Sequence, residues 1–172
     1  LIAKFDQWLG FDWRTYKAAI GDAPWLSEAL IGGYQSLRPQ LEILPFLFIM
    51  SGHPARARFL LNCFWLGAII VTLISMAVPT IDAYLWHGEV IKDELGYYTG
   101  LDRIDHLQML RDGSMKSIRI ADMAGLICFP SFHTVAGCLF AGFSVCLGPA
   151  RLGIAALNGL LIAATPHNGG HY

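Results

Sequence analysis

The chain has 172 residues and a formal net charge of −1, and 55% of its residues are hydrophobic whereas only 15% are charged. This balance excludes an ordinary soluble domain and indicates a membrane protein. No basic tract of five or more residues occurs, so nothing indicates nucleic acid as a partner. The four cysteines lie in or beside apolar runs without metal-ligand spacing, which is typical of small core residues.

The first fifty residues predict a boundary segment followed by one long helix. Residues 1–23 mix apolar, aromatic and charged side chains, which fits either an interfacial segment or an amphipathic helix that covers other helices. Residues 24–50 are apolar but broken by charges and prolines. As one helix they would be about 40 Å long, enough to span a bilayer with a tilt or a proline kink. Arg38 within it faces a bundle interior or pairs with Glu42 one turn later.

The clearest transmembrane span follows a short polar turn. The 21 residues 59–79 carry no charge, and Arg56 and Arg58 precede them, which marks that end as cytoplasmic by the positive-inside rule. Residues 124–150 have no formal charge, and the 15 uncharged residues 152–166 form a shorter second run. If the crossings alternate, Arg151 between these runs lies on the same side as Arg56 and Arg58.

Residues 80–123 differ in kind, because they hold 13 of the 25 charged residues of the chain. Glycines and tyrosines punctuate this stretch, so we expect an ordered extramembrane loop with short helices, on the face opposite the arginine turn. Long loops within a compact domain are usually functional.

Residues 129–134 have the pattern of a helix start. Pro130 and Ser131 precede an uncharged run, with Ser131 as the candidate N-cap. Helix N-termini carry unpaired N–H groups and about half a positive charge, so they bind phosphate well. The same turn supplies His133, whose side chain gives or takes a proton near neutral pH.

A second histidine follows a glycine pair at the end of the chain. Gly169 and Gly170 allow the backbone to approach a ligand closely before His171. Alternating crossings would bring His171 and His133 to one membrane face. Two histidines so placed divide the work of phosphoryl transfer, one attacking phosphorus while the other protonates the leaving oxygen. His167 is a possible lining residue of the same site.

The sequences Pro-Ser-Phe-His-Thr at 130–134 and Gly-Gly-His-Tyr at 169–172 resemble the second and third signature motifs of the type-2 phosphatidic acid phosphatase superfamily. The likeness is to its inositol-phosphorylceramide-synthase-like and sphingomyelin-synthase-like branch, in a bacterial member, and covers about residues 24–172. It implies an integral membrane enzyme with a core of six helices. It implies that His171 is the nucleophile, forming a phosphohistidine, and that His133 protonates the leaving alcohol. Ser131, with backbone N–H groups near Phe132, Thr134 and Gly170, would bind the phosphoryl oxygens.

Several positions depart from the family pattern. Phe132 replaces the usual glycine, and Ala164 and Thr165 replace a serine and arginine, so a phosphate-clamping arginine is missing. The first motif is not found, since Ile31 stands where its lysine should precede Arg38. Another cation must balance the phosphate: Arg111 is the first candidate, followed by Arg119 and Lys116, against the alternative that all three are solvated loop charges.

The sequence therefore predicts an all-α, multi-pass transmembrane bundle, with one membrane-embedded domain over residues 1–172 and terminal helices of the six-helix core outside these residues. We expect a lipid phosphatase or lipid phosphotransferase without metal or other cofactor, acting on a lipid phosphate or pyrophosphate. Its partners are that substrate and membrane lipids, and its expected place is a bacterial inner membrane, with the active site on the non-cytoplasmic face.

Two alternatives remain open. One is a non-catalytic membrane scaffold or a transporter fragment that keeps the family fold. The other is a metal-dependent hydrolase whose ligands are His106, His133, His167 and His171. Zinc needs three or four ligands at fixed geometry, and the glycine pair at 169–170 disfavours a helix that would align His167 with His171.

Overall fold

The computed structural model describes residues 5–6, 8–78, 80, 83–87, 91–92, 98–99, 108–109, 112–114, 116–117 and 127–170. The regular elements among these residues are helices, apart from one antiparallel pairing of two short strands. In chain order the elements are α2 (Trp13–Gly21), α3 (Pro24–Gln35), α4 (Leu37–Met50), α5 (Pro54–Ala77), α6 (Ala83–Trp86), β1 (Ile91–Lys92), β2 (Tyr98–Thr99), α8 (Phe132–Phe143), the 3₁₀ turn η2 (Ser144–Cys146) and α9 (Ala150–Asn168).

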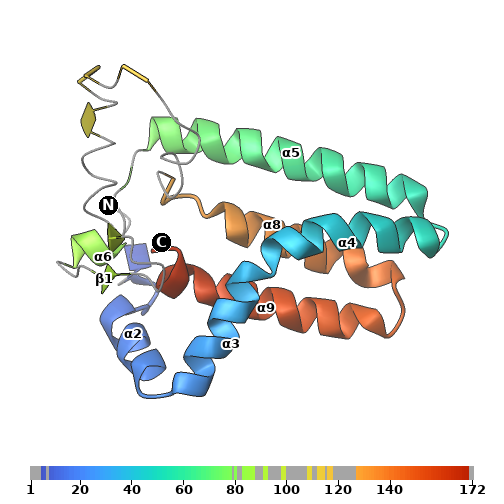
Figure 1. The fold of residues 1–172 in the computed structure, drawn as a ribbon, viewed down its shortest axis with the longest axis horizontal. Helices are drawn as coiled ribbons and strands as arrows, with labels where there is room; N and C mark the ends of the chain where they lie inside the picture. Colours follow the sequence, from blue (N-terminus) through green and yellow to red (C-terminus); the bar gives the residue numbers. More distant parts are fainter. Residues whose placement is uncertain are drawn as a thin grey trace.

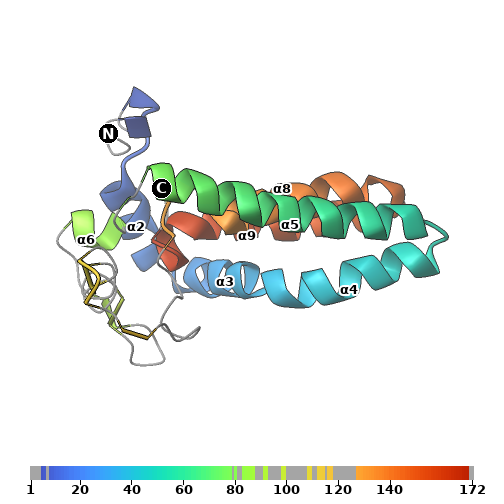
Figure 2. The same ribbon diagram turned by 90° about the horizontal axis from the view of Figure 1, so that it is seen from above.

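The long helices form an elongated bundle. Helices α3 and α4 follow one another along its axis, beside α5, α8 and α9 (Figures 1 and 2). The main packed pairs are α3 with α9, α8 with α9, α4 with α5, and α5 with α8. Helices α2 and α6 lie at one end, where α9 ends and α8 begins (Figure 1). The turns from α4 to α5 and from η2 to α9 lie at the other end.

The predicted helix over residues 24–50 is present but divided at Ser36, which caps the end of α3 and the start of α4. The break lies one turn before Pro39, because a proline has no N–H for the carbonyl four residues earlier. The Ser36 hydroxyl donates to the Gly33 carbonyl at 2.6 Å and so satisfies a carbonyl near the end of α3.

Helix α5 contains most of the span predicted at 59–79. Among the described residues it is the helix that is long and apolar enough to cross a membrane. Its 24 residues give about 36 Å at 1.5 Å per residue, more than the hydrocarbon thickness of about 30 Å. Large apolar side chains along it are exposed: Phe59, Trp65, Leu66, Ile69, Ile70, Leu73, Ile74 and Met76. That several helices cross stays a prediction.

Two apolar clusters hold the bundle together. The first joins α4, α5 and α8 through Leu44, Phe48, Leu60, Phe64, Ala136 and Phe140. The second joins α2, α3 and α9 through Ile20, Leu30 and Ala164. Gly33 of α3 makes this second contact close: a Cβ there would lie 2.9 Å from the Leu160 Cβ on α9.

The amphipathic segment before residue 23 folds as α2 and covers the bundle end. The Asp12 carboxylate caps α2 by accepting from the Thr15 N–H at 2.6 Å. Trp13 is buried, and its Nε1–H donates to the Pro166 carbonyl of α9 at 2.9 Å. Helix α2 thus packs on other helices, whereas a position of this segment at the membrane boundary stays a prediction. Trp8 before it is exposed. Most of the predicted loop 80–123 lies outside the described residues.

Candidate active site

The predicted helix start at Ser131 is confirmed. Helix α8 begins at Phe132, and Ser131 is its N-cap, with the hydroxyl accepting from the Thr134 N–H at 3.4 Å. Ser131 is buried, with 5% of its surface exposed. The positive end of the dipole of this 12-residue helix favours an anion at its start. His133 stands in the first turn.

The imidazole of His133 stacks on an aromatic ring that the sequence did not single out. The rings of His133 and Tyr34 lie 4.0 Å apart between centroids, with 14° between their planes. Tyr34 is on α3, so this contact joins two helices far apart in the chain. No local pattern around Tyr34 could have indicated it, because the pairing depends on how α3 and α8 pack across the bundle.

Phe132 faces the core rather than the site. Its ring packs edge-on against Phe64 of α5 at 4.9 Å between centroids, beside the first apolar cluster. The predicted role of Phe132 in phosphate binding is therefore limited to its backbone N–H. This aromatic contact joins the start of α8 to α5.

The end of α9 meets the start of α8. The hydroxyl oxygens of Thr134 and Thr165 are 3.5 Å apart, and the Thr165 hydroxyl donates to the Ile162 carbonyl. Gly170 is buried at a φ of +60°, and its carbonyl accepts from the Ala83 N–H at 3.0 Å. Up to Gly170 the two motifs thus lie at one end of the bundle. His171 lies outside the described residues, so its place beside His133 stays a prediction.

His167 is tied to α6 and lies near a lysine. The Tyr84 hydroxyl donates to the His167 carbonyl and lies 3.4 Å from His167 Nδ1. The Lys17 ammonium on α2 lies 5.2 Å from the Tyr84 ring centre and 5.4 Å from that of Trp13, and it is within electrostatic range of His167. Burial lowers the pKa of Lys17, because the charged form loses hydration. The sequence did not single out Lys17 or Tyr84.

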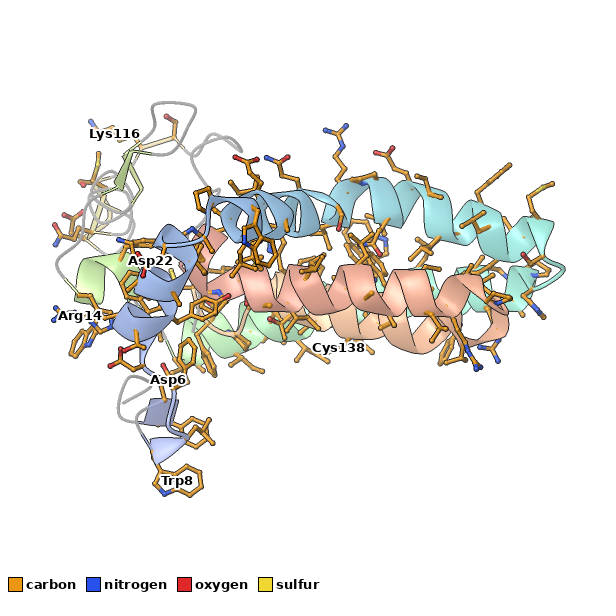
Figure 3. The ribbon with its side chains drawn as sticks, turned by 90° about the horizontal axis from the view of Figure 1, so that it is seen from below. Asp6, Trp8, Arg14, Asp22, Lys116 and Cys138 are labelled. Atoms are coloured by element: carbon orange, nitrogen blue, oxygen red, sulfur yellow. The ribbon has the colours of Figure 1, made fainter. Side chains whose placement is uncertain are left out.

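His87 contacts two residues of α2, Trp13 and Arg14. Its ring stacks on Trp13 at 4.9 Å with 4° between planes, and its carbonyl accepts from Arg14 Nη2 at 3.2 Å. Burial, and then the Arg14 charge, lower the pKa of His87, while Asp12 opposes them. Figure 3 shows the charged residues that it labels, Asp6, Arg14, Asp22 and Lys116, together at this end of the molecule.

The remaining predicted residues are not brought into a described site. Arg38 is exposed on α4 and pairs with Glu42 at 3.3 Å, the pairing that its spacing predicted. Lys116 is exposed in its loop segment. Arg111, Arg119 and His106 lie outside the described residues. Over the part of the chain that the structure describes, no three histidine, cysteine, aspartate or glutamate side chains group as metal ligands would.

Comparison with protein families tests the superfamily relationship that the two motifs indicated. The family model of the PAP2 superfamily matches residues 1–172, the whole chain. The chain belongs to the PAP2 superfamily. Members of this superfamily are generally phosphatases, which supports a phosphoric ester hydrolase or phosphotransferase, and membership together with α5 supports a membrane association. Comparison with curated proteins and with solved structures finds no match to this chain.

Proposed function

We propose that this PAP2 superfamily member is an integral membrane enzyme that removes or transfers the phosphoryl group of a lipid phosphate or pyrophosphate, through a phosphohistidine at His171. The observation that carries the proposal is the convergence of two chain segments. The capped start of α8 with His133 meets the end of α9, which leads through Gly170 to His171. An anion site and a proton donor thereby adjoin the segment that carries the nucleophile.

In the first chemical step a nitrogen lone pair of His171 attacks phosphorus. The bond from phosphorus to the leaving oxygen breaks, and its electron pair stays on that oxygen. Protonated His133 gives its proton to this oxygen, so the leaving group departs as an alcohol, or as a phosphate when the substrate is a pyrophosphate. A positioned acid of this kind contributes about 10²- to 10⁴-fold to the rate.

In the second step a hydroxyl group attacks the phosphohistidine. The phosphorus–nitrogen bond breaks, His171 regains its lone pair, and neutral His133 takes the proton of the attacking hydroxyl. Water as the attacker gives hydrolysis, whereas a lipid alcohol gives transfer. The same two histidines serve both outcomes, so the acceptor depends on what the site admits rather than on the catalytic pair.

Charge balance for the phosphoryl group comes from the helix start and from cations at the same end. The N–H groups after Ser131 bind phosphoryl oxygens, as helix N-termini do. Lys17 is a described cation at this end, held by the rings of Trp13 and Tyr84 within electrostatic range of His167 on α9. Lysine binds phosphate as a point charge. The loop cations Arg111, Arg119 and Lys116 complete the set of candidates, and no metal ion is required.

The bundle is proposed to cross the membrane along its long axis. Helices α5 and α9 begin at the end opposite the site (Figure 1). Near these starts, Arg56, Arg58 and Arg151 are exposed. Basic residues mark the cytoplasmic side of membrane proteins, so this orientation opens the site to the non-cytoplasmic face of a bacterial inner membrane. The exposed apolar side chains of α5 then face lipid.

The test uses the full-length protein in lipid nanodiscs with a dioleoyl phosphatidic acid and a polyprenyl pyrophosphate as substrates. Phosphate release and phosphoryl transfer to diacylglycerol are measured with and without EDTA, for the wild type and for His133→Asn and His171→Asn. The control is His53→Asn, at the far end of the bundle. A labelled protein adduct that is stable in base and labile in acid should form in the wild type and in His133→Asn, but not in His171→Asn.

We expect both site variants to lose at least about 10²-fold in turnover, with His53→Asn unchanged and EDTA without effect. Wild-type activity retained in either site variant would end the proposal. Complete absence of turnover and of vanadate binding in the wild type would favour the non-catalytic scaffold, and loss of activity in EDTA the metal-dependent hydrolase.

A further inference from the structure

We propose that Tyr34 is a positioning residue for His133: the face of its ring fixes the plane of the imidazole that donates the proton. This inference rests on the function proposed above. The contact is direct, with 4.0 Å between ring centroids and 14° between planes. Both imidazole nitrogens lie in the ring plane, so a partner stacked on the face does not itself occupy them.

The Tyr34 ring can orient the His133 ring only if its own position is fixed. Tyr34 packs against the cluster of Ile20, Leu30 and Ala164, which joins α2, α3 and α9. The preceding residue, Gly33, brings the α3 backbone against Leu160 of α9. The position of the Tyr34 ring is thus supported by a close contact of α3 with α9, the helix that ends near the site.

The stack bears on both steps of the reaction. Proton transfer requires the imidazole N–H to point at the leaving oxygen, and a misplacement of about 1 Å costs about 10²-fold in rate. His133 is also positively charged before the first step and after the second. A cation on an aromatic face is stabilised by the negative ring quadrupole, so the Tyr34 ring supports the form of His133 that acts as the acid.

The experiment separates the ring from the hydroxyl and from general packing. Tyr34→Leu removes the aromatic face, and Tyr34→Phe keeps it without the hydroxyl. The matched control is Tyr16→Leu, which removes an aromatic residue from the same cluster together with its hydrogen bond to the Ala163 carbonyl. Values of kcat and KM are measured in nanodiscs with the phosphatidic acid substrate, and if Tyr34→Leu does not fold, Tyr34→Met takes its place.

We expect Tyr34→Leu to lower kcat by about 10- to 100-fold with KM changed less than about twofold, because Tyr34 acts through His133 and not through substrate binding. Tyr34→Phe should restore kcat to near the wild-type value. Tyr16→Leu should leave kcat unchanged. The inference is overturned if Tyr34→Leu keeps wild-type kcat, if Tyr34→Phe is as impaired as Tyr34→Leu, or if KM rises while kcat stays.

A spectroscopic readout tests the stack apart from turnover. Protons of an imidazole stacked on an aromatic face resonate upfield, so the His133 ring protons should move downfield in Tyr34→Leu and stay in Tyr34→Phe. A stack seen in the spectra together with an inactive wild type would refute the proposed function but leave the contact standing. An active wild type with unshifted His133 resonances in Tyr34→Leu would refute only the role of Tyr34.

Discussion

Replacing Gly33 by alanine tests the contact on which the site is built. Gly33 is buried in α3, where it faces α9. An added Cβ would lie 2.9 Å from the Leu160 Cβ and 3.1 Å from both the Leu160 carbonyl carbon and the Leu161 nitrogen. Two of these three atoms are backbone, so a rotamer change cannot relieve the overlap, and α3 must move away from α9.

The neighbouring residue provides the reference. Gly32 is also in α3, and a Cβ there would meet nothing within 4 Å. Gly32→Ala should stabilise the protein by about 0.5–1 kcal/mol, the gain in helix propensity. Gly33→Ala has the same gain but forces an overpacked contact that costs about 1–3 kcal/mol. The free energy of unfolding should therefore be lower in Gly33→Ala than in Gly32→Ala by about 1–3 kcal/mol.

Equilibrium unfolding in detergent, followed by circular dichroism, measures this difference, and the lipid phosphate assay measures its consequence. Because a shift of α3 carries Tyr34 away from His133, kcat should fall in Gly33→Ala and not in Gly32→Ala. Equal stability of the two variants would refute the close approach of α3 to α9. A destabilised Gly33→Ala with normal kcat would show that the site does not depend on that approach.

Four further outcomes are expected. Ser131→Ala should cost about 1 kcal/mol of stability through the lost N-cap and raise KM, whereas Ser131→Asn should retain the cap. Asn158 Nδ2 donates to Gln40 Oε1 at 2.7 Å between buried side chains. Asn158→Leu or Gln40→Leu alone should lower the free energy of unfolding in detergent by about 1–2 kcal/mol, and the double variant should lose less than the sum of the two single losses. Since the pKa of His87 is lowered from 6.5, the unfolded chain binds more protons below that pH; stability should fall as pH drops below 6.5, and less so in His87→Gln. Lys17→Met should raise KM for lipid phosphate, with Lys17→Arg near wild type.

Local signals predicted some of the helix boundaries. Ser131 as an N-cap and the uncharged run at 59–79 both depend on residues within a few positions of one another. Capping, proline geometry and hydropathy act at that range. The start of α5 was placed too late, because Pro54 opens the helix within the stretch read as a polar turn. For residues 24–50 a tilt and a proline kink were both left open, and the structure shows two helices that divide one turn before Pro39.

The contacts that bring the candidate site residues together could not be predicted from the sequence. Tyr34 meets His133, and Thr134 meets Thr165, only because the helices pack as they do. Nothing in the residues next to Tyr34 distinguishes it from an ordinary aromatic of an apolar helix. The same holds for Lys17, which composition places among boundary charges and the structure places against the rings of Trp13 and Tyr84.

Residues 33–40 combine a close helix contact, an aromatic stack and a chain of hydrogen bonds. Gly33 lets α3 touch α9, and Tyr34 then reaches His133. Ser36 lies where the helix divides, and it is part of a chain of hydrogen bonds. Its hydroxyl donates to the Gly33 carbonyl and accepts from Gln40 Nε2 at 2.8 Å, and Gln40 Oε1 accepts from Asn158. This chain of hydrogen bonds links α3 and α4 to Asn158 of α9. Because a buried polar network is costly when its partners separate, we expect it to oppose sliding of α3 and α4 along α9 and so to support the positioning role proposed for Tyr34.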